Sequence, residues 1–182
     1  RAVLYPLTFC RECGQEYFLT ALGGAEHGAH LLPRPALLNA PDDEITGEAG
    51  YFAVEENGLW DEQEDLPDNW LGWRKSGPRV KKNYAGFVPR CMWLQPDGAV
   101  LPSETDGATA GWWMPRPFMM CLRCRASYDL RQKSDFVKLV TLSQTGCSTA
   151  TTVVSAASVA ALRVENSVPE DAQKLLSFTD NR

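Results

Sequence analysis

The sequence carries Cys10-Arg11-Glu12-Cys13 near its start and Cys121-Leu122-Arg123-Cys124 in its last third, and these two C-x-x-C stretches decide the fold. In each copy a tyrosine follows four positions after the second cysteine, at Tyr17 and at Tyr128. Two intervening residues let both thiolates converge on one metal ion, while nearby backbone amides offset their charge. The pair of half-sites predicts one tetrahedral structural zinc site whose ligands are Cys10, Cys13, Cys121 and Cys124.

Two other uses of the cysteines remain open. A disulfide framework is less favoured, because C-x-x-C pairs without secretory features suit reduced thiols in the cytosol. Rubredoxin-like iron also takes four cysteines from two such pairs. Cys91 lies in an apolar strand-like run and is expected to be a buried structural thiol, and Cys147 precedes a predicted helix. Four cysteines complete a zinc shell, so His27 and His30 are expected in a surface loop.

The bulk composition is that of a folded protein. The chain has 182 residues, 44% of them hydrophobic, and six tryptophans. This length suits one domain with a real core, or a small domain and part of another. No run of eighteen apolar residues occurs, and the first residues lack the apolar stretch and cleavage site of a secretory signal. We therefore expect a cytoplasmic protein with no membrane partner.

Charge is uneven along the chain. Residues 1–120 carry 10 Lys/Arg and 17 Asp/Glu, a net of −7, whereas residues 121–182 carry 8 and 6, a net of +2. The first part is therefore a poor general polyanion binder. Its densest basic patch consists of Arg79, Lys81 and Lys82, which lie beside aromatic residues. This patch is interpreted either as a group of phosphate contacts or as the solvated face of a strand. The neighbouring rings of Trp60, Trp70 and Trp73 are interpreted as caps on a small β core, with base or peptide stacking as the alternative.

Strand and turn signals dominate the first 130 residues. Residues 2–9 and 15–22 predict a hairpin with the first C-x-x-C turn at its tip, and residues 51–55 predict a further strand. A second hairpin is predicted for residues 87–94 and 99–101, around the turn Gln95-Pro96-Asp97-Gly98. Residues 1–130 are thus predicted to form a zinc-binding, β-rich, zinc-ribbon-like domain.

The character of the sequence changes after Asp129. A polar connector leads to a predicted helix over 148–163, capped by Ser148, and residues 174–180 then predict an apolar strand. Residues 131–182 are therefore predicted to be a connector, a helix and the first strand of a truncated α/β domain. The predicted fold class of the whole chain is α+β.

Two stretches of this last part resemble a known family. Gly146-Cys147-Ser148-Thr149-Ala150-Thr151-Thr152 and Lys174-Leu175-Leu176-Ser177-Phe178-Thr179-Asp180-Asn181-Arg182 are similar to superfamily 2 DEAD/DEAH-box helicases. In particular, they are similar to large bacterial members with a cysteine-rich insert between their two RecA-like motor domains. The final stretch resembles the motif IV region that begins the second RecA-like domain, which in the family usually continues with Gln-Asp-Ala. Several relatives carry Arg where this chain has Cys147.

The resemblance implies a zinc-stabilised structural or interaction module from an ATP-dependent DNA helicase. The chain contains neither G-x-x-x-x-G-K-S/T nor an acidic Mg-binding helicase box, so it is expected to be inactive alone, with ATP and Mg bound only by the intact parent. Its partners would be the rest of the motor and, through the parent, DNA. By resemblance Thr179, Asn181 and Arg182 would lie near the nucleic-acid backbone, as candidate contacts to it, or in the cleft between the motor domains. The alternative is a free-standing zinc-ribbon module that binds protein or nucleic acid.

Overall fold

Antiparallel strands make up nearly all of the regular structure that is described. The computed structural model describes residues 2–24, 28–35, 46–61, 64–74 and 77–141, together with Ser155, Val159 and Pro169. The chain divides into two compact units, Arg1–Val140 and Thr141–Arg182. The β-rich part of the fold prediction is confirmed in the first unit.

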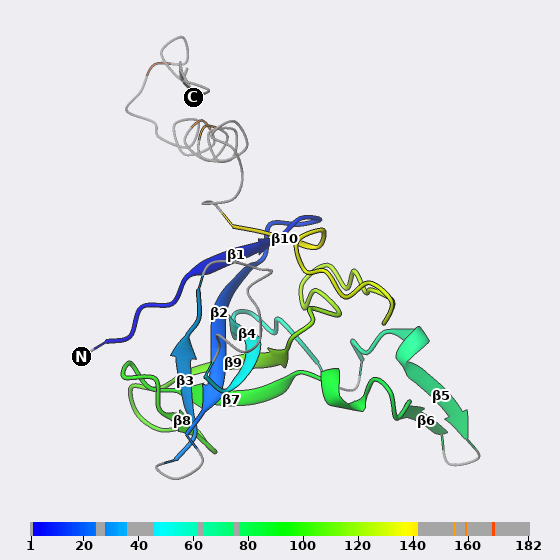
Figure 1. The fold of residues 1–182 in the computed structure, drawn as a ribbon, viewed down its shortest axis with the longest axis horizontal. Helices are drawn as coiled ribbons and strands as arrows, with labels where there is room; N and C mark the ends of the chain where they lie inside the picture. Colours follow the sequence, from blue (N-terminus) through cyan, green and yellow to red (C-terminus); the bar gives the residue numbers. More distant parts are fainter. Residues whose placement is uncertain are drawn as a thin grey trace. The chain divides into compact units, whose positions relative to one another are not determined.

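The strands of the first unit are short, with eight residues in the longest. They are β1 (Leu7–Cys10), β2 (Glu16–Gly23), β3 (His30–Pro33), β4 (Glu48–Val54), β5 (Leu71–Arg74), β6 (Gly77–Val80), β7 (Arg90–Leu94), β8 (Val100–Leu101), β9 (Thr109–Pro115) and β10 (Leu139–Val140). Two 3-10 turns, η2 (Asp68–Trp70) and η3 (Ala85–Phe87), complete the set, and the described part of residues 2–141 contains no α-helix. Figure 1 shows their arrangement.

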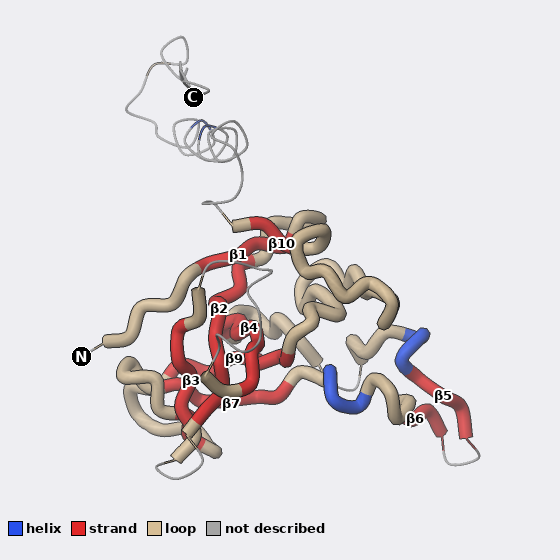
Figure 2. Tube along the Cα trace, viewed as in Figure 1, coloured by secondary structure: helices blue, strands red, loops and turns tan. Residues whose placement is uncertain are grey.

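Eight of these strands form one sheet that closes on itself. Its order is β10-β1-β2-β4-β9-β7-β8, and β3 pairs with β2. Backbone hydrogen bonds from Leu31 N to Gly98 O (2.8 Å) and from Val100 N to Ala29 O (2.8 Å) join β3 to the far end of the sheet. The strands β2, β4, β9, β7, β8 and β3 therefore make a small closed barrel (Figure 2), and β1 and β10 extend the sheet beside it.

The barrel interior is filled by alternate side chains of its strands, as a small barrel requires. Phe52 on β4 lies opposite Trp113 on β9, and both are buried. A Cβ at Gly50 would lie 2.4 Å from the Trp113 ring, and one at Gly111 would lie 2.2 Å from the Phe52 ring. Each ring thus covers a glycine of the paired strand, so these two positions have no room for a side chain. The other buried members of this core are Leu31, Met92 and Leu94.

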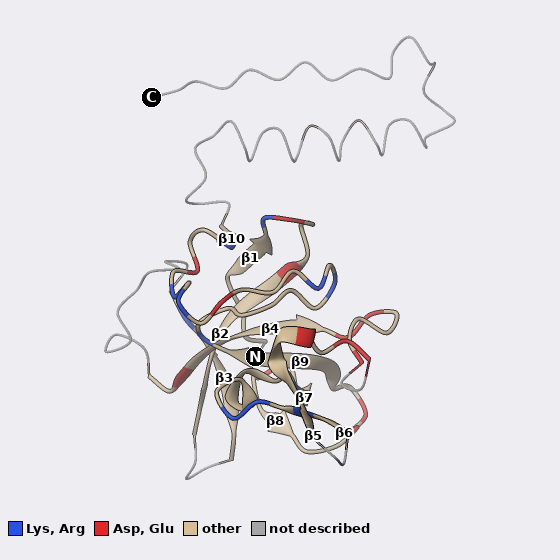
Figure 3. Ribbon diagram, turned by 90° about the vertical axis from the view of Figure 1, so that its right-hand side faces the viewer, with Lys and Arg blue, Asp and Glu red and all other residues tan. Residues whose placement is uncertain are grey.

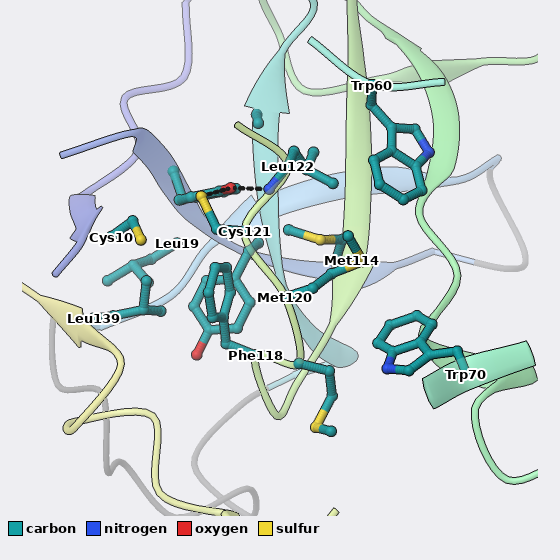
Figure 4. Packing of buried hydrophobic residues seen from close by; sticks show 14 of the residues in the cluster. Cys10, Leu19, Trp60, Trp70, Met114, Phe118, Met120, Cys121, Leu122 and Leu139 are labelled. Atoms are coloured by element: carbon teal, nitrogen blue, oxygen red, sulfur yellow. Dashed lines mark hydrogen bonds between the residues drawn. The ribbon is translucent and has the colours of Figure 1, made fainter. Parts of the chain in front are cut away.

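A second core covers the outer face of β2, β4 and β9. Tyr17, Leu19, Tyr51 and Met114 point out of the barrel because strand side chains alternate between faces. Residues 118–122 pack over them, as do the rings of Trp60 and Trp70 (Figure 4). The segment that carries the second C-x-x-C stretch is therefore part of the hydrophobic core.

Both predicted hairpins are confirmed. β1 pairs with β2 around the first C-x-x-C turn, and β7 pairs with β8 around residues 95–98. The prediction that Cys91 is buried is wrong. On β7 the alternating side chains of Met92 and Leu94 face the interior, which leaves Cys91 exposed on the outside.

The last part of the chain is described at only a few positions. Ser155 and Val159, within the predicted helix over 148–163, have α-helical backbone. The rest of that helix and the predicted strand over 174–180 lie outside the described residues, as does the RecA-like α/β portion of the fold prediction. Among the described residues, no helix is long and apolar enough to cross a membrane.

Candidate metal centre

The four predicted metal ligands lie together in the structure. The Sγ atoms of Cys10, Cys13, Cys121 and Cys124 all lie within 4.8 Å of one another. Cys10 Sγ is 4.0 Å from Cys124 Sγ, and Cys13 Sγ is 3.6 Å from Cys121 Sγ. A zinc–sulfur bond of about 2.3 Å in a regular tetrahedron places sulfur atoms about 3.8 Å apart. The cluster therefore has the dimensions of a four-thiolate zinc site, and these four cysteines form no disulfide.

The two C-x-x-C stretches, which we call the knuckles, share one backbone design. Cys10 N donates to Gln15 O (2.9 Å), and Cys121 N donates to Ala126 O (2.9 Å). The residue after each second cysteine has a positive φ, +77° at Gly14 and +62° at Arg125, and its N–H donates to the carbonyl oxygen of the first cysteine. These tight turns bring the two thiols of each knuckle to one point.

Tyr17 connects the first hairpin to the second knuckle. Its fully buried hydroxyl donates to Cys121 Sγ (3.2 Å) and accepts from Leu122 N (2.8 Å), the contact drawn as a dashed line in Figure 4. A hydrogen bond to a ligand sulfur orients the ligand and reduces its charge. The matched tyrosine Tyr128 is only partly buried, and its ring instead packs near Phe118.

The thiols share their negative charge unequally. The neighbouring Cys10 thiol lowers the pKa of Cys121, and the nearby Cys121, together with burial, raises the pKa of Cys10. Burial raises the pKa of Cys124 to about 11. Without a metal, the surrounding protein groups therefore favour a cluster in which some of the thiols keep their protons. Four thiolates at this spacing require a cation between them. Four sulfur ligands also fill a tetrahedral shell, which is typical of a structural site.

Arg125 ties the second knuckle to the acidic loop that follows β4. Its Nη1 donates to Leu59 O (2.9 Å), its Nη2 pairs with Asp65, and its guanidinium lies 5.3 Å from the centre of the Trp60 ring. A non-glycine residue in the left-handed region costs about 1 to 2 kcal/mol. These three contacts of one side chain explain why an arginine occupies the position where the first knuckle has Gly14.

A buried polar cluster that the sequence did not indicate holds both knuckles in place. Asp135 and Lys138 are fully buried, and Lys138 Nζ lies 3.3 Å from Asp135 Oδ1. Together they bind the backbone N–H and C=O of Phe118, which lies three residues before Cys121. Phe118 N donates to Asp135 Oδ1 (2.8 Å), Lys138 Nζ donates to Phe118 O (2.7 Å), and Tyr51 donates to Asp135 Oδ2 (2.6 Å). On the other side Arg11 N, in the first knuckle, donates to Lys138 O (3.0 Å).

Residues 131–140 thus pack with the first unit, although the sequence assigned them to a polar connector. β10 pairs with β1 in the register Phe9↔Val140 and Cys10↔Leu139. Burial lowers the pKa of Lys138, while the adjacent Asp135 opposes that shift. The pattern Asp-x-x-Lys within a polar stretch carries no burial signal, so only the contacts with Tyr51 and Phe118 reveal the role of this pair.

The other predicted site residues that the structure describes lie apart from the metal ligands. Arg79 lies on β6, with Lys81 and Lys82 just after it, and all three side chains are exposed. His30 begins β3 and is not in the cysteine cluster. The predicted positions outside the described residues are His27, Cys147, Thr179, Asn181 and Arg182.

A groove of about 560 Å³ lies beside the knuckles. Its charged lining residues are Glu16, Glu56, Arg123 and Arg125. Because both signs of charge are present and Arg125 already pairs with Asp65, the groove does not favour a ligand of one charge.

Comparisons with protein-family models, curated proteins and solved structures give no match for this chain. The function therefore has to be argued from the geometry of the metal centre and of the surfaces around it.

Proposed function

We propose that the first unit is a zinc-stabilised structural and interaction module of a cytoplasmic protein. One observation carries the proposal: four sulfur atoms from two segments more than a hundred residues apart lie within 4.8 Å of one another. When bound, zinc would neutralise the thiolates and cross-link the segments, so that its binding free energy becomes folding free energy. The protein groups position the thiols through the knuckle turns, Tyr17 and the buried Asp135–Lys138 pair.

Elemental analysis of protein purified without added metal tests this function. We expect one zinc per chain, lost from Cys13→Ser and Cys124→Ser and retained in Cys91→Ser, which changes an exposed thiol elsewhere on the sheet. A red protein that contains iron would identify a rubredoxin-like centre instead. A metal content near zero, with disulfides in its place, would contradict the proposal.

The wider proposal is that this module belongs to an ATP-dependent DNA helicase, whose motor domains would be its partners and would bind ATP, Mg and DNA. Its support is the resemblance of residues 146–152 and 174–182 to superfamily 2 helicases. Sequencing the complete gene tests it. Gln-Asp-Ala after Arg182 and a phosphate-binding loop upstream of the knuckles are expected, and a gene with neither contradicts the helicase context.

A further inference from the structure

Charges of opposite sign occupy adjacent segments of the first unit. Residues 55–68 contain seven acidic and no basic residues, whereas residues 69–84 contain five basic and no acidic residues. The second segment forms the β5–β6 hairpin and its two flanks. Figure 3 marks the described acidic and basic residues. Residues 1–120 are therefore acidic in total but contain one basic segment, residues 69–84.

Several acidic side chains of the first segment are engaged within the protein. Glu55 accepts hydrogen bonds from Leu59 N (2.9 Å) and from the Trp112 indole. Asp65 accepts from Asp61 N (2.7 Å) and pairs with Arg125. These carboxylates shape the loop after β4 and are partly neutralised there. Among the described residues, no ion pair joins any of them to Arg79, Lys81 or Lys82.

The base of the hairpin is firmly anchored. Trp70 is fully buried and stacks on Tyr84, with ring centres 5.2 Å apart and planes 13° apart. Lys81 N donates to Trp70 O (2.8 Å), and Lys81 Nζ donates to Asn69 O (2.9 Å). The hairpin thus has a defined position on the second core, and its outer part projects from the barrel (Figure 1).

Trp73, on the outer part of this hairpin, has 81% of its surface exposed. With Arg79, Lys81 and Lys82 it lines a hollow of about 240 Å³. That volume is below the roughly 300 to 1,000 Å³ of small-molecule pockets, so it suits one flat group at a surface. An exposed indole face beside cations is the combination that stacks a base and contacts its phosphates.

We propose that the β5–β6 hairpin is a contact site for single-stranded nucleic acid, a function beyond the zinc-stabilised module. Trp73 stacks on one unpaired base, and the long side chains of Arg79 and Lys82, which line the same hollow, bind phosphates of the same strand. Single strands are favoured because duplex bases are covered on both faces by their neighbours. An acidic peptide would satisfy the cations but would leave the indole without a partner, so it is the less favoured occupant.

Fluorescence anisotropy of the whole zinc-loaded chain with labelled oligothymidine of about 12 nucleotides, within the known range of site sizes, tests the proposal. Trp73→Ala is expected to weaken binding about tenfold, whereas Trp73→Phe, which keeps a flat ring, retains most of the affinity. Arg79→Ala with Lys82→Ala is expected to reduce the slope of log affinity against log salt by about 1.4, since each single-strand phosphate contact contributes about 0.7.

A charge-matched control separates a site from general attraction. Arg131→Ala with Lys133→Ala removes two exposed cations outside the hairpin and is expected to leave affinity within about twofold. The proposal is overturned if the wild-type chain shows no binding, or if the control loses as much affinity as the hairpin variants. Equal affinity for the duplex or for a glutamate-rich peptide also overturns it. Zinc content, measured for every variant, reports the proposed module function independently.

Discussion

The knuckles and the β5–β6 hairpin differ in the sequence separation of their contacts and in the exposure of their side chains. The knuckles join residues far apart in sequence, as in the contact of Cys13 Sγ with Cys121 Sγ at 3.6 Å, and the first cysteine of each knuckle is buried. The hairpin pairs residues close in sequence, Leu71 with Val80 and Trp73 with Pro78, and leaves its outer side chains in solvent. The entropic cost of closing a loop rises with its length, and metal–thiolate bonds can offset that cost for the knuckles. The hairpin closes a short loop at a lower cost and does not need such bonds.

Two tryptophans show the same contrast over three residues. Trp70 is fully buried against Tyr84, whereas Trp73 is 81% exposed. The interpretation of the Trp rings as caps on a β core is confirmed for Trp60 and Trp70, and it is wrong for Trp73. The difference arises because Trp70 ends η2 at the base of the hairpin, while Trp73 lies farther along β5, beyond the part that packs on the core.

Removal of the metal is expected to have the largest effect. Structural zinc contributes about 10 to 16 kcal/mol in small zinc domains, which is comparable to the total stability of about 5 to 15 kcal/mol of a typical protein. We therefore expect a chelator to abolish the cooperative thermal unfolding transition of the first unit. Circular dichroism with and without chelator measures this. An unchanged transition would show that the knuckles close without a metal.

Truncation of the two tryptophans is the next test. Trp70→Ala is expected to lower the free energy of unfolding by about 3 to 5 kcal/mol, because it empties a buried site. Trp73→Ala is expected to change it by no more than about 0.5 kcal/mol, as for other exposed positions. Urea unfolding of the zinc-loaded variants compares them. Similar losses for both variants would contradict the division between an anchored base and an available outer part.

The third expected effect is a pH dependence of stability from Tyr51, smaller than the loss expected for Trp70→Ala. Burial, and then the charge of Asp135, raise the pKa of Tyr51 well above its ordinary value of 10.0. Below about pH 10, Tyr51 is neutral in both the folded and the unfolded state, so its contribution to stability is complete. Above about pH 10 the unfolded state ionises first, so the free energy of unfolding falls by up to about 1.4 kcal/mol per pH unit.

Tyr51→Phe lacks this titration, and its unfolding free energy is expected to decline less steeply above about pH 10. Other tyrosines titrate equally in both proteins, so the difference between the two urea-unfolding series isolates Tyr51. Parallel declines would mean that the hydroxyl is not held as a buried donor to Asp135.

The local elements could be predicted because short-range chemistry determines them. The spacing of two residues between paired cysteines brings two thiols together wherever the turn lies, and Gly14 permits the positive φ of the first turn. The turn at residues 95–98 and the alternation along β7 likewise depend on neighbours in sequence. The association of the two knuckles also followed from sequence, since each offers only half of a tetrahedral shell.

Burial at single positions was decided by tertiary structure. Cys91 and Trp73 are apolar residues in strand-like runs, yet the register of β7 and the length of the β5–β6 hairpin place them in solvent. Asp135 and Lys138 are charged, yet they are fully buried because they complete hydrogen bonds to Phe118 and Tyr51. The sequence by itself determined the strands, the turns and the cysteine half-sites, for which the causes lie within a few residues. Only the folded chain decided which faces are covered, because burial depends on partners that are distant in sequence.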